Sequence, residues 1–123
     1  MSGSTPVLLD LDGDLPLATA SIDVVLCTDV IEHLVEPKKT LIEMWRVLRP
    51  GGTVIVFTPP YDSARWNLAE WVHRIITGRQ ADHISPFTRE SLTWWFGRYF
   101  VDCRLGRVNW NLSMYAVGRK RVD

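Results

Sequence analysis

One segment, residues 22–58, constrains the fold of this 123-residue chain more than any other. Two apolar, β-branched runs at residues 22–27 and 53–58 flank an amphipathic stretch that begins near Pro37 and ends in Arg-Pro-Gly-Gly at residues 49–52. This pattern predicts a strand, a helix and a second strand joined by short turns. Such a unit forms a right-handed crossover between neighbouring parallel strands, so we predict an α/β domain.

Local signals within this unit give further expectations. The continuous apolar run in the first strand predicts a sheet that is covered on both faces. In the helix we expect Leu41, Trp45 and Leu48 to form one apolar stripe, flanked by Ile42 and Met44, because they recur at helical spacing. The glycine pair at residues 51–52 can supply the left-handed residue that ends the helix.

The remaining segments extend this sheet. Residues 7–11 are predicted to form a short strand, and the apolar spacing within residues 62–77 predicts a helix that ends at Gly78. Thr88 is the expected N-cap of another helix through residue 98, with Ser91 as a weaker candidate. Residues 100–108 and 112–119 resemble strands, and the turn at 109–111 between them predicts an antiparallel hairpin.

Length and composition fit one small domain. Apolar residues make up 46% of the chain, and 14 basic side chains balance 14 acidic ones. We therefore expect no attraction to nucleic acid through net charge, and no apolar run is long enough for membrane insertion. The two cysteines form neither a disulfide framework nor a zinc spacing, which favours a reducing cytoplasm and no metal site. We expect a flexible leader at residues 1–6, a domain at 7–119 and a solvated basic tail at 120–123.

Polar residues gather where the two predicted parallel strands end. Glu32 and His33 follow the first strand, and Tyr61 follows the second. Ligands of open parallel sheets bind beyond the carboxyl ends of the strands, so this edge is the expected site. Because histidine titrates near neutrality, His33 is the best candidate for a general base; a scaffold role in the loop is the alternative.

Five short motifs occur in series over this region, and they are Asp-Leu-Pro-Leu at 14–17, Ser-Ile-Asp-Val-Val at 21–25, Glu-His-Leu at 32–34, Glu-Pro at 36–37 and Leu-Arg-Pro-Gly-Gly at 48–52. Together they resemble the second half of a class I S-adenosylmethionine (SAM)-dependent methyltransferase of type 11, a kind that includes the ubiquinone-biosynthesis O-methyltransferases. His-Ile-Ser-Pro-Phe-Thr at 83–88 resembles the segment before the last helix of that family. No Gly-x-Gly-x-Gly turn occurs, so we expect that the front, SAM-binding half of the family is missing.

The resemblance implies a partial Rossmann-like sheet with a C-terminal antiparallel hairpin, flanked by helices. The strand order would be 22–27, 53–58, 112–119, 100–108, with one antiparallel strand. It also implies methyl transfer from SAM to a small-molecule or lipid-like acceptor. The residues implied in contact with the cofactor are Asp10, Leu11, Asp12, Cys27 and Thr28. For the aspartates the alternative is turn formation, and for Cys27 it is a small buried residue.

The acceptor pocket implied by the resemblance has Glu32, Tyr61, Trp66 and His83 as lining residues. The tryptophans have packing in a core or a dimer contact as their alternative. If the front half is absent, methyl transfer by the isolated chain is expected to be impaired. The alternative function is a non-catalytic remnant of the fold that acts as a binding or dimerisation module. A homodimer or swapped assembly, or residues 7–11, would cover the otherwise exposed edge of the first strand.

Overall fold

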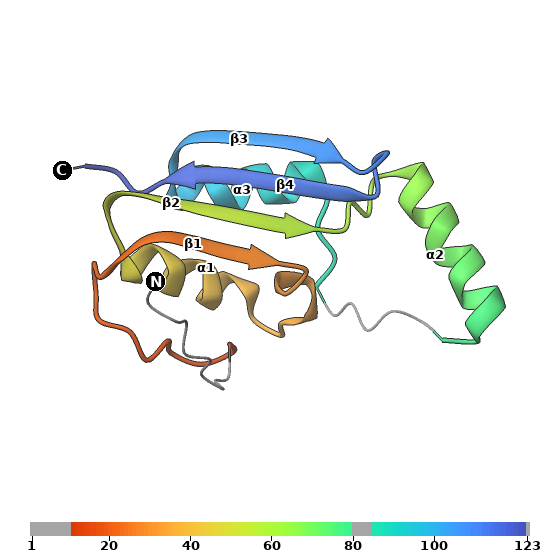
Figure 1. Ribbon diagram of the computed structural model, residues 1–123, viewed down its shortest axis with the longest axis horizontal. Coiled ribbons are helices and arrows are strands. Elements are labelled where there is room, and N and C mark those ends of the chain that lie inside the picture. The colour runs from red at the N-terminus through yellow and green to blue at the C-terminus, as the bar shows by residue number, and fades with distance from the viewer. Residues whose placement is uncertain (1–10, 80–84, 123) are drawn as a thin grey trace, which may run out of the picture.

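A computed structural model describes residues 11–79 and 85–122 of the chain (Figure 1). It contains one four-stranded sheet with the strand order β1-β2-β4-β3. The elements in chain order are β1 (Ile22–Thr28), the 3-10 helix η1 (Ile31–His33), α1 (Pro37–Val47), β2 (Leu48–Thr58), α2 (Ala64–Thr77), α3 (Arg89–Tyr99), β3 (Val101–Val108) and β4 (Ser113–Arg119). The predicted leader and most of the predicted strand at 7–11 lie outside the described residues, and Leu11 lies in a turn.

The topology confirms the predicted α/β architecture. β1 pairs with β2 in parallel, β2 pairs with β4 antiparallel, and β4 pairs with β3 antiparallel. Only β4 therefore runs against the other strands, as the arrows in Figure 1 show. The carboxyl ends of β1 and β2 meet at one edge of the sheet, called here the rim, and Thr28 lies beside Phe57 there.

The helix ends agree with the local sequence signals in α2 and α3. The Ser63 side chain accepts a hydrogen bond from the Trp66 N–H at the start of α2, and Gly78 closes that helix with φ +68°. Thr88 caps α3 in a reciprocal capping box with Ser91. Both helices therefore begin after a side chain that caps the free N–H groups, and α2 ends at a glycine that takes the left-handed conformation.

The predicted end of α1 is wrong. The helix ends at Val47, and Leu48 is already extended, with φ −67° and ψ 137°. Gly51 does have a positive φ of +82°, but it lies in β2, after the helix has ended. Its N–H donates to the Lys120 carbonyl, and the Lys120 N–H donates to the Gly52 carbonyl. The glycine pair therefore joins the start of β2 to the end of β4, where a Cβ on Gly52 would lie 2.9 Å from the Arg49 carbonyl.

The apolar stripe of α1 also differs from the prediction. Leu41, Met44 and Val47 are buried, whereas Trp45 is 40% exposed. The reason lies far away in the sequence, because the Lys120 Nζ lies 4.2 Å from the centroid of the Trp45 ring and donates to the Leu48 carbonyl. Lys120 is only 8% exposed, so the expectation of a solvated tail is wrong at this residue.

The sheet is covered on one face only. In Figure 1, α1 and α3 lie on the same side of the sheet, and α2 extends away from its end. Alternate residues of β2 and β4, among them Val54, Val56 and Ala116, belong to the core on the covered side. On the other face Val24 is 55% exposed and Leu26 is 63% exposed. The prediction that both faces are covered is therefore wrong for the residues that the structure describes.

Candidate functional site

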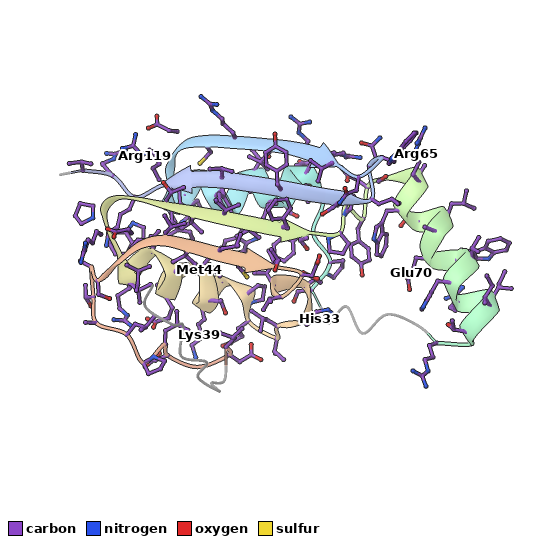
Figure 2. The ribbon with its side chains drawn as sticks, in the orientation of Figure 1. His33, Lys39, Met44, Arg65, Glu70 and Arg119 are labelled. Atoms are coloured by element: carbon purple, nitrogen blue, oxygen red, sulfur yellow. The ribbon has the colours of Figure 1, made fainter. Side chains whose placement is uncertain are left out.

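The rim brings together the loops that the sequence predicts to form the site. After β1, the chain turns at Asp29, whose φ is +52° and whose N–H donates to the Phe57 carbonyl. It then forms η1, which carries Glu32 and His33. Figure 2 shows His33 at the end of the sheet where β1 and β2 finish. The predicted placement of these loops at one edge is confirmed.

Glu32 is fully buried, with no exposed area. Its Oε2 accepts a hydrogen bond of 2.9 Å from the Thr58 hydroxyl at the end of β2. Its Oε1 has no hydrogen-bond partner among the described residues. A buried oxygen without a partner costs about 1–3 kcal/mol, so this carboxylate is held in place by the surrounding packing. Thr58 was not among the sequence candidates, because nothing local links it to Glu32.

The segment before α3 holds this loop from the other side. The Ser85 N–H donates to the Glu32 carbonyl at 2.9 Å, and the Ser85 hydroxyl donates to the Leu34 carbonyl at 2.8 Å. Pro60 and Phe87 form an isolated parallel bridge, and the Tyr61 N–H donates to the Phe87 carbonyl. These contacts explain why the Glu-His-Leu and Ser-Pro-Phe motifs occur together in one chain. His83 itself lies outside the described residues.

His33 is exposed at the rim and lies against this buried carboxylate. Its side chain is 45% exposed, whereas that of Glu32 is 1% exposed, and 3.7 Å separate His33 Nε2 from Glu32 Oε1. The imidazole can therefore meet a ligand from solvent while a carboxylate stands behind it.

Cys27 and Thr28, at the end of β1, have different surroundings. Cys27 is 7% exposed, and burial raises the pKa of its thiol to about 11, with the Glu32 carboxylate adding to the rise. The thiol is therefore protonated near neutral pH, which supports a buried packing role over that of a nucleophile. Thr28 is exposed at the rim.

Leu11 and Asp12 contact the loop that leads into α1. The Leu11 carbonyl accepts a hydrogen bond from the Thr40 hydroxyl at 2.8 Å. Asp12 Oδ1 accepts from the N–H groups of Val35 and Glu36, at 3.1 and 3.3 Å. At least one oxygen of Asp12 therefore serves the local structure, and Asp10 lies outside the described residues.

Tyr61 and Trp66 form an aromatic pair at the rim. Their ring centroids are 4.3 Å apart, and the Tyr61 carbonyl accepts a hydrogen bond from the Asn67 side chain. Burial raises the pKa of the Tyr61 phenol to about 12, and the carboxylates of Glu70 and Glu32 add to the rise. Tyr61 is therefore a hydrogen-bond donor rather than a base near neutral pH.

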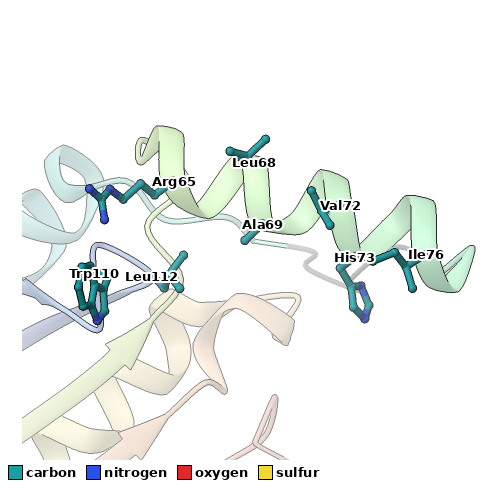
Figure 3. Close-up of a pocket in the computed structure, with 8 residues that line it drawn as sticks. All are labelled: Arg65, Leu68, Ala69, Val72, His73, Ile76, Trp110 and Leu112. Atoms are coloured by element: carbon teal, nitrogen blue, oxygen red, sulfur yellow. The ribbon is translucent and has the colours of Figure 1, made fainter.

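A separate apolar groove runs along α2 (Figure 3). It has a volume of about 750 Å³, and Trp110 and Leu112, on the turn between β3 and β4, form its other wall. Its residues from α2 are Arg65, Leu68, Ala69, Val72, His73 and Ile76. None of the predicted pocket residues lines it, and no sequence signal pointed to Trp110.

The described residues hold neither a membrane-spanning helix nor a cluster of metal-binding side chains. No described helix is long and apolar enough to cross a membrane. Within the described ranges, no three histidine, cysteine, aspartate or glutamate side chains come together as a potential metal site.

The sequence matches to known proteins concern the part of the chain that contains β1, α1 and most of β2. Residues 4–56 match the family model of a methyltransferase domain. A probable SAM-dependent methyltransferase of Mycolicibacterium smegmatis is 52% identical over 46 residues, which are 37% of this chain and 18% of the relative. A demethylmenaquinone methyltransferase of Clavibacter sepedonicus is 40% identical over 55 residues, which are 42% of this chain and 22% of the relative. The chain thus aligns with less than a quarter of these relatives' lengths.

Solved structures show the same fold. A SAM-dependent methyltransferase of Thermotoga maritima superposes with a TM-score of 0.74 at 18% identity, over 90% of this chain and 61% of the other. A second one, from Archaeoglobus fulgidus, gives a TM-score of 0.67 at 12% identity, over 85% of this chain and 62% of the other. Residues 4–56 thus match a methyltransferase domain, and the whole described chain has the Rossmann-like fold of class I SAM-dependent methyltransferases. The cofactor that this family and fold imply is SAM.

Proposed function

We propose that the chain takes part in the transfer of a methyl group from SAM to a small-molecule or lipid-like acceptor at the rim. When bound, SAM supplies an activated methyl group on a sulfonium. The protein must mainly hold the two reactants at close range and, for an oxygen, nitrogen or sulfur acceptor, remove a proton. The observation that carries the proposal is the exposed imidazole of His33, with the buried carboxylate of Glu32 3.7 Å behind it.

In this proposal His33 is the general base. It would accept the proton that the acceptor loses when the acceptor is methylated. Glu32 lies beside the imidazole and does not meet the acceptor itself, because it is buried. Tyr61 and Trp66 form the acceptor side, together with His83, and the protonated phenol of Tyr61 donates a hydrogen bond to the acceptor.

The residues at the strand ends fit part of the cofactor. Thr28 is exposed at the end of β1, and the backbone of Cys27 and Thr28 would hold the methionine end of SAM. Asp10, Leu11 and Asp12 would contact the adenine. Because the chain has no Gly-x-Gly-x-Gly turn, we expect the isolated chain to bind the cofactor weakly and to transfer methyl groups poorly.

We further propose a homodimer or swapped assembly of the domain at residues 7–119, located in the cytoplasm. The exposed Val24 and Leu26 support the assembly, because an apolar edge strand of this kind pairs readily with another chain. The two free cysteines support a reducing compartment.

Thermal unfolding with S-adenosylhomocysteine tests the proposal. A ligand at about a hundred times its dissociation constant stabilises the folded state by about 2.7 kcal/mol. For a domain of this size we expect a rise of several degrees in the melting temperature. NAD shares the adenosine moiety and is the matched control, for which we expect no shift.

Each outcome of this experiment decides between functions. A saturable shift with S-adenosylhomocysteine alone supports a site for the SAM type of cofactor. No shift with either ligand favours the alternative, a non-catalytic remnant that acts as a binding or dimerisation module. A shift with NAD alone contradicts a methyltransferase site.

A further inference from the structure

The helix α2 turns its polar side toward the rest of the protein. None of its residues is buried, and only Trp66 and Glu70 are half-buried. Trp66 contacts Tyr61 through its ring, the Glu70 carboxylate acts on the Tyr61 phenol through its charge, and the Asn67 side chain donates a hydrogen bond to the Tyr61 carbonyl. Figure 2 shows Glu70 on the side of the helix that faces the sheet. This arrangement is the reverse of the usual one, in which a surface helix packs its apolar stripe on the core.

The apolar residues of α2 therefore remain exposed on the other side. They follow one another at helical spacing, and their exposed fractions are 61% for Leu68, 54% for Trp71, 40% for Val72, 62% for Ile75 and 76% for Ile76. Positions separated by three, four, seven and eight residues share one side of a helix, so these side chains form a single stripe.

The turn between β3 and β4 extends this stripe. Trp110 and Leu112 are 81% and 40% exposed, and they line the same groove as Leu68 and Val72 (Figure 3). Asn109, Trp110 and Asn111 all have positive φ, which is an unfavourable conformation for a residue as bulky as tryptophan. The protein thus holds a large aromatic ring in solvent at a conformational cost, and such strain gathers at functional sites.

Positive charges flank this apolar surface although the whole chain is neutral. Arg65 lies beside the stripe and Arg79 follows the end of the helix, whereas Glu70 and Arg74, four residues apart, share the opposite side. The Arg65 guanidinium lies 5.9 Å from the centroid of the Trp110 ring. Apolar and aromatic residues beside arginines are typical of helices that lie in the interface of an anionic bilayer.

We propose that α2 and the Trp110 turn dock this protein on the surface of a lipid bilayer that contains anionic lipids. The helix would lie in the plane of the interface, because 14 residues span about 21 Å, less than the ~30 Å of the hydrocarbon core. A second copy on the same surface fits less well, since it would bring the arginines of the two chains together. The proposal does not depend on methyl transfer.

Co-sedimentation of the full chain with lipid vesicles tests the proposal. We expect binding to phosphatidylcholine vesicles that contain phosphatidylglycerol, weaker binding to pure phosphatidylcholine, and a further loss at high salt. Trp71→Ala should lower the binding constant by about tenfold or more, because it removes a large apolar ring from the interface. Trp94→Ala is the matched control, since Trp94 on α3 is 55% exposed and Trp71 is 54% exposed.

A second pair of variants tests the charges. Arg65→Gln should lower binding by about fivefold, the effect of one arginine near an anionic surface. Arg104→Gln removes the same charge from an exposed site on β3 and should leave binding unchanged. Circular dichroism of each variant confirms that its fold is retained.

Three results would overturn the proposal. The first is no co-sedimentation with either kind of vesicle. The second is an equal loss of binding in Trp71→Ala and Trp94→Ala. The third is self-association without vesicles that Trp71→Ala abolishes, which would make a second copy the occupant of this surface. None of them affects the response to S-adenosylhomocysteine, so the docking surface and the methyl-transfer site succeed or fail separately.

Discussion

At the scale of single residues, the motif that contains Glu32 predicts where this residue lies but not its burial or its partners. The Glu-His pair follows β1 and Tyr61 follows β2, and the parallel pairing of these strands places both on the predicted rim. We predicted Glu32 as a pocket residue, yet it is buried under the contacts from Thr58 and Ser85. Both partners are distant in sequence, and local patterns carry no information about such pairs. The roles of His33 and Thr28 remain predictions.

Cys27 gives a prediction for the pH dependence of stability. Burial raises the pKa of its thiol from 9.0 to about 11, so the folded state holds this proton more tightly than the unfolded state does. The resulting stabilisation is fully present below about pH 9 and is lost as the pH rises toward 11. Urea unfolding should therefore show a loss of about 1 kcal/mol between about pH 8 and pH 10.

Cys27→Ala should remove most of this loss, whereas Cys103→Ala should retain it, because Cys103 is only half-buried. The same pH dependence in the wild type and in Cys27→Ala would show that burial does not hold this proton.

At the scale of elements, local sequence signals predicted the ends of a helix correctly where no distant residue takes part. Ser63, Gly78 and Thr88 are short-range signals, and the bounds of α2 and α3 follow them closely. The prediction of the end of α1 was wrong, because the backbones of Gly51 and Gly52 form hydrogen bonds with Lys120, which comes much later in the chain. Similarly, helical periodicity predicted α2 correctly, but periodicity does not tell which side of a helix meets the protein.

Replacing two of the glycines by alanine should change the stability of the protein in opposite directions. Gly78 ends α2 with φ +68°, and Gly97 lies within α3; a Cβ at either position would meet no atom within 4 Å. Gly78→Ala should destabilise the protein by about 1 kcal/mol, because alanine avoids the left-handed conformation. Gly97→Ala should stabilise it by about 0.5–1 kcal/mol, because alanine loses less conformational entropy in a helix.

Denaturant midpoints of the two variants and the wild type provide the measurement. Midpoints that move in the same direction would contradict the backbone conformations described for these two positions.

At the scale of the whole molecule, the strand order and directions were predicted correctly from the strand-helix-strand unit and the hairpin. The prediction that helices cover both faces of the sheet was wrong. The apolar run of β1 does not reveal whether one face or both faces are covered. Val24 and Leu26 remain exposed in the described structure, and this open face is the basis of the proposed assembly.

Leu26→Lys tests that assembly. The residue is 63% exposed, so the substitution should change the stability of the monomer by no more than about 0.5 kcal/mol. It should nevertheless weaken self-association, because a charge on an edge strand opposes pairing. Val35→Lys, at a position 66% exposed in the loop before α1, is the control. Light scattering that shows a monomer for the wild type at all concentrations would contradict the assembly.

The central proposal is that the rim at the ends of β1 and β2 is the binding site of the SAM cofactor that the fold implies. Backbone amide NMR during titration with S-adenosylhomocysteine tests it most directly. The account predicts saturable shifts at Thr28, Asp29 and His33, and none at Ile22 and Thr53, which begin the two parallel stretches of the strands. Saturable shifts confined to Ile22 and Thr53, or no saturable shift at any residue, would contradict the claim.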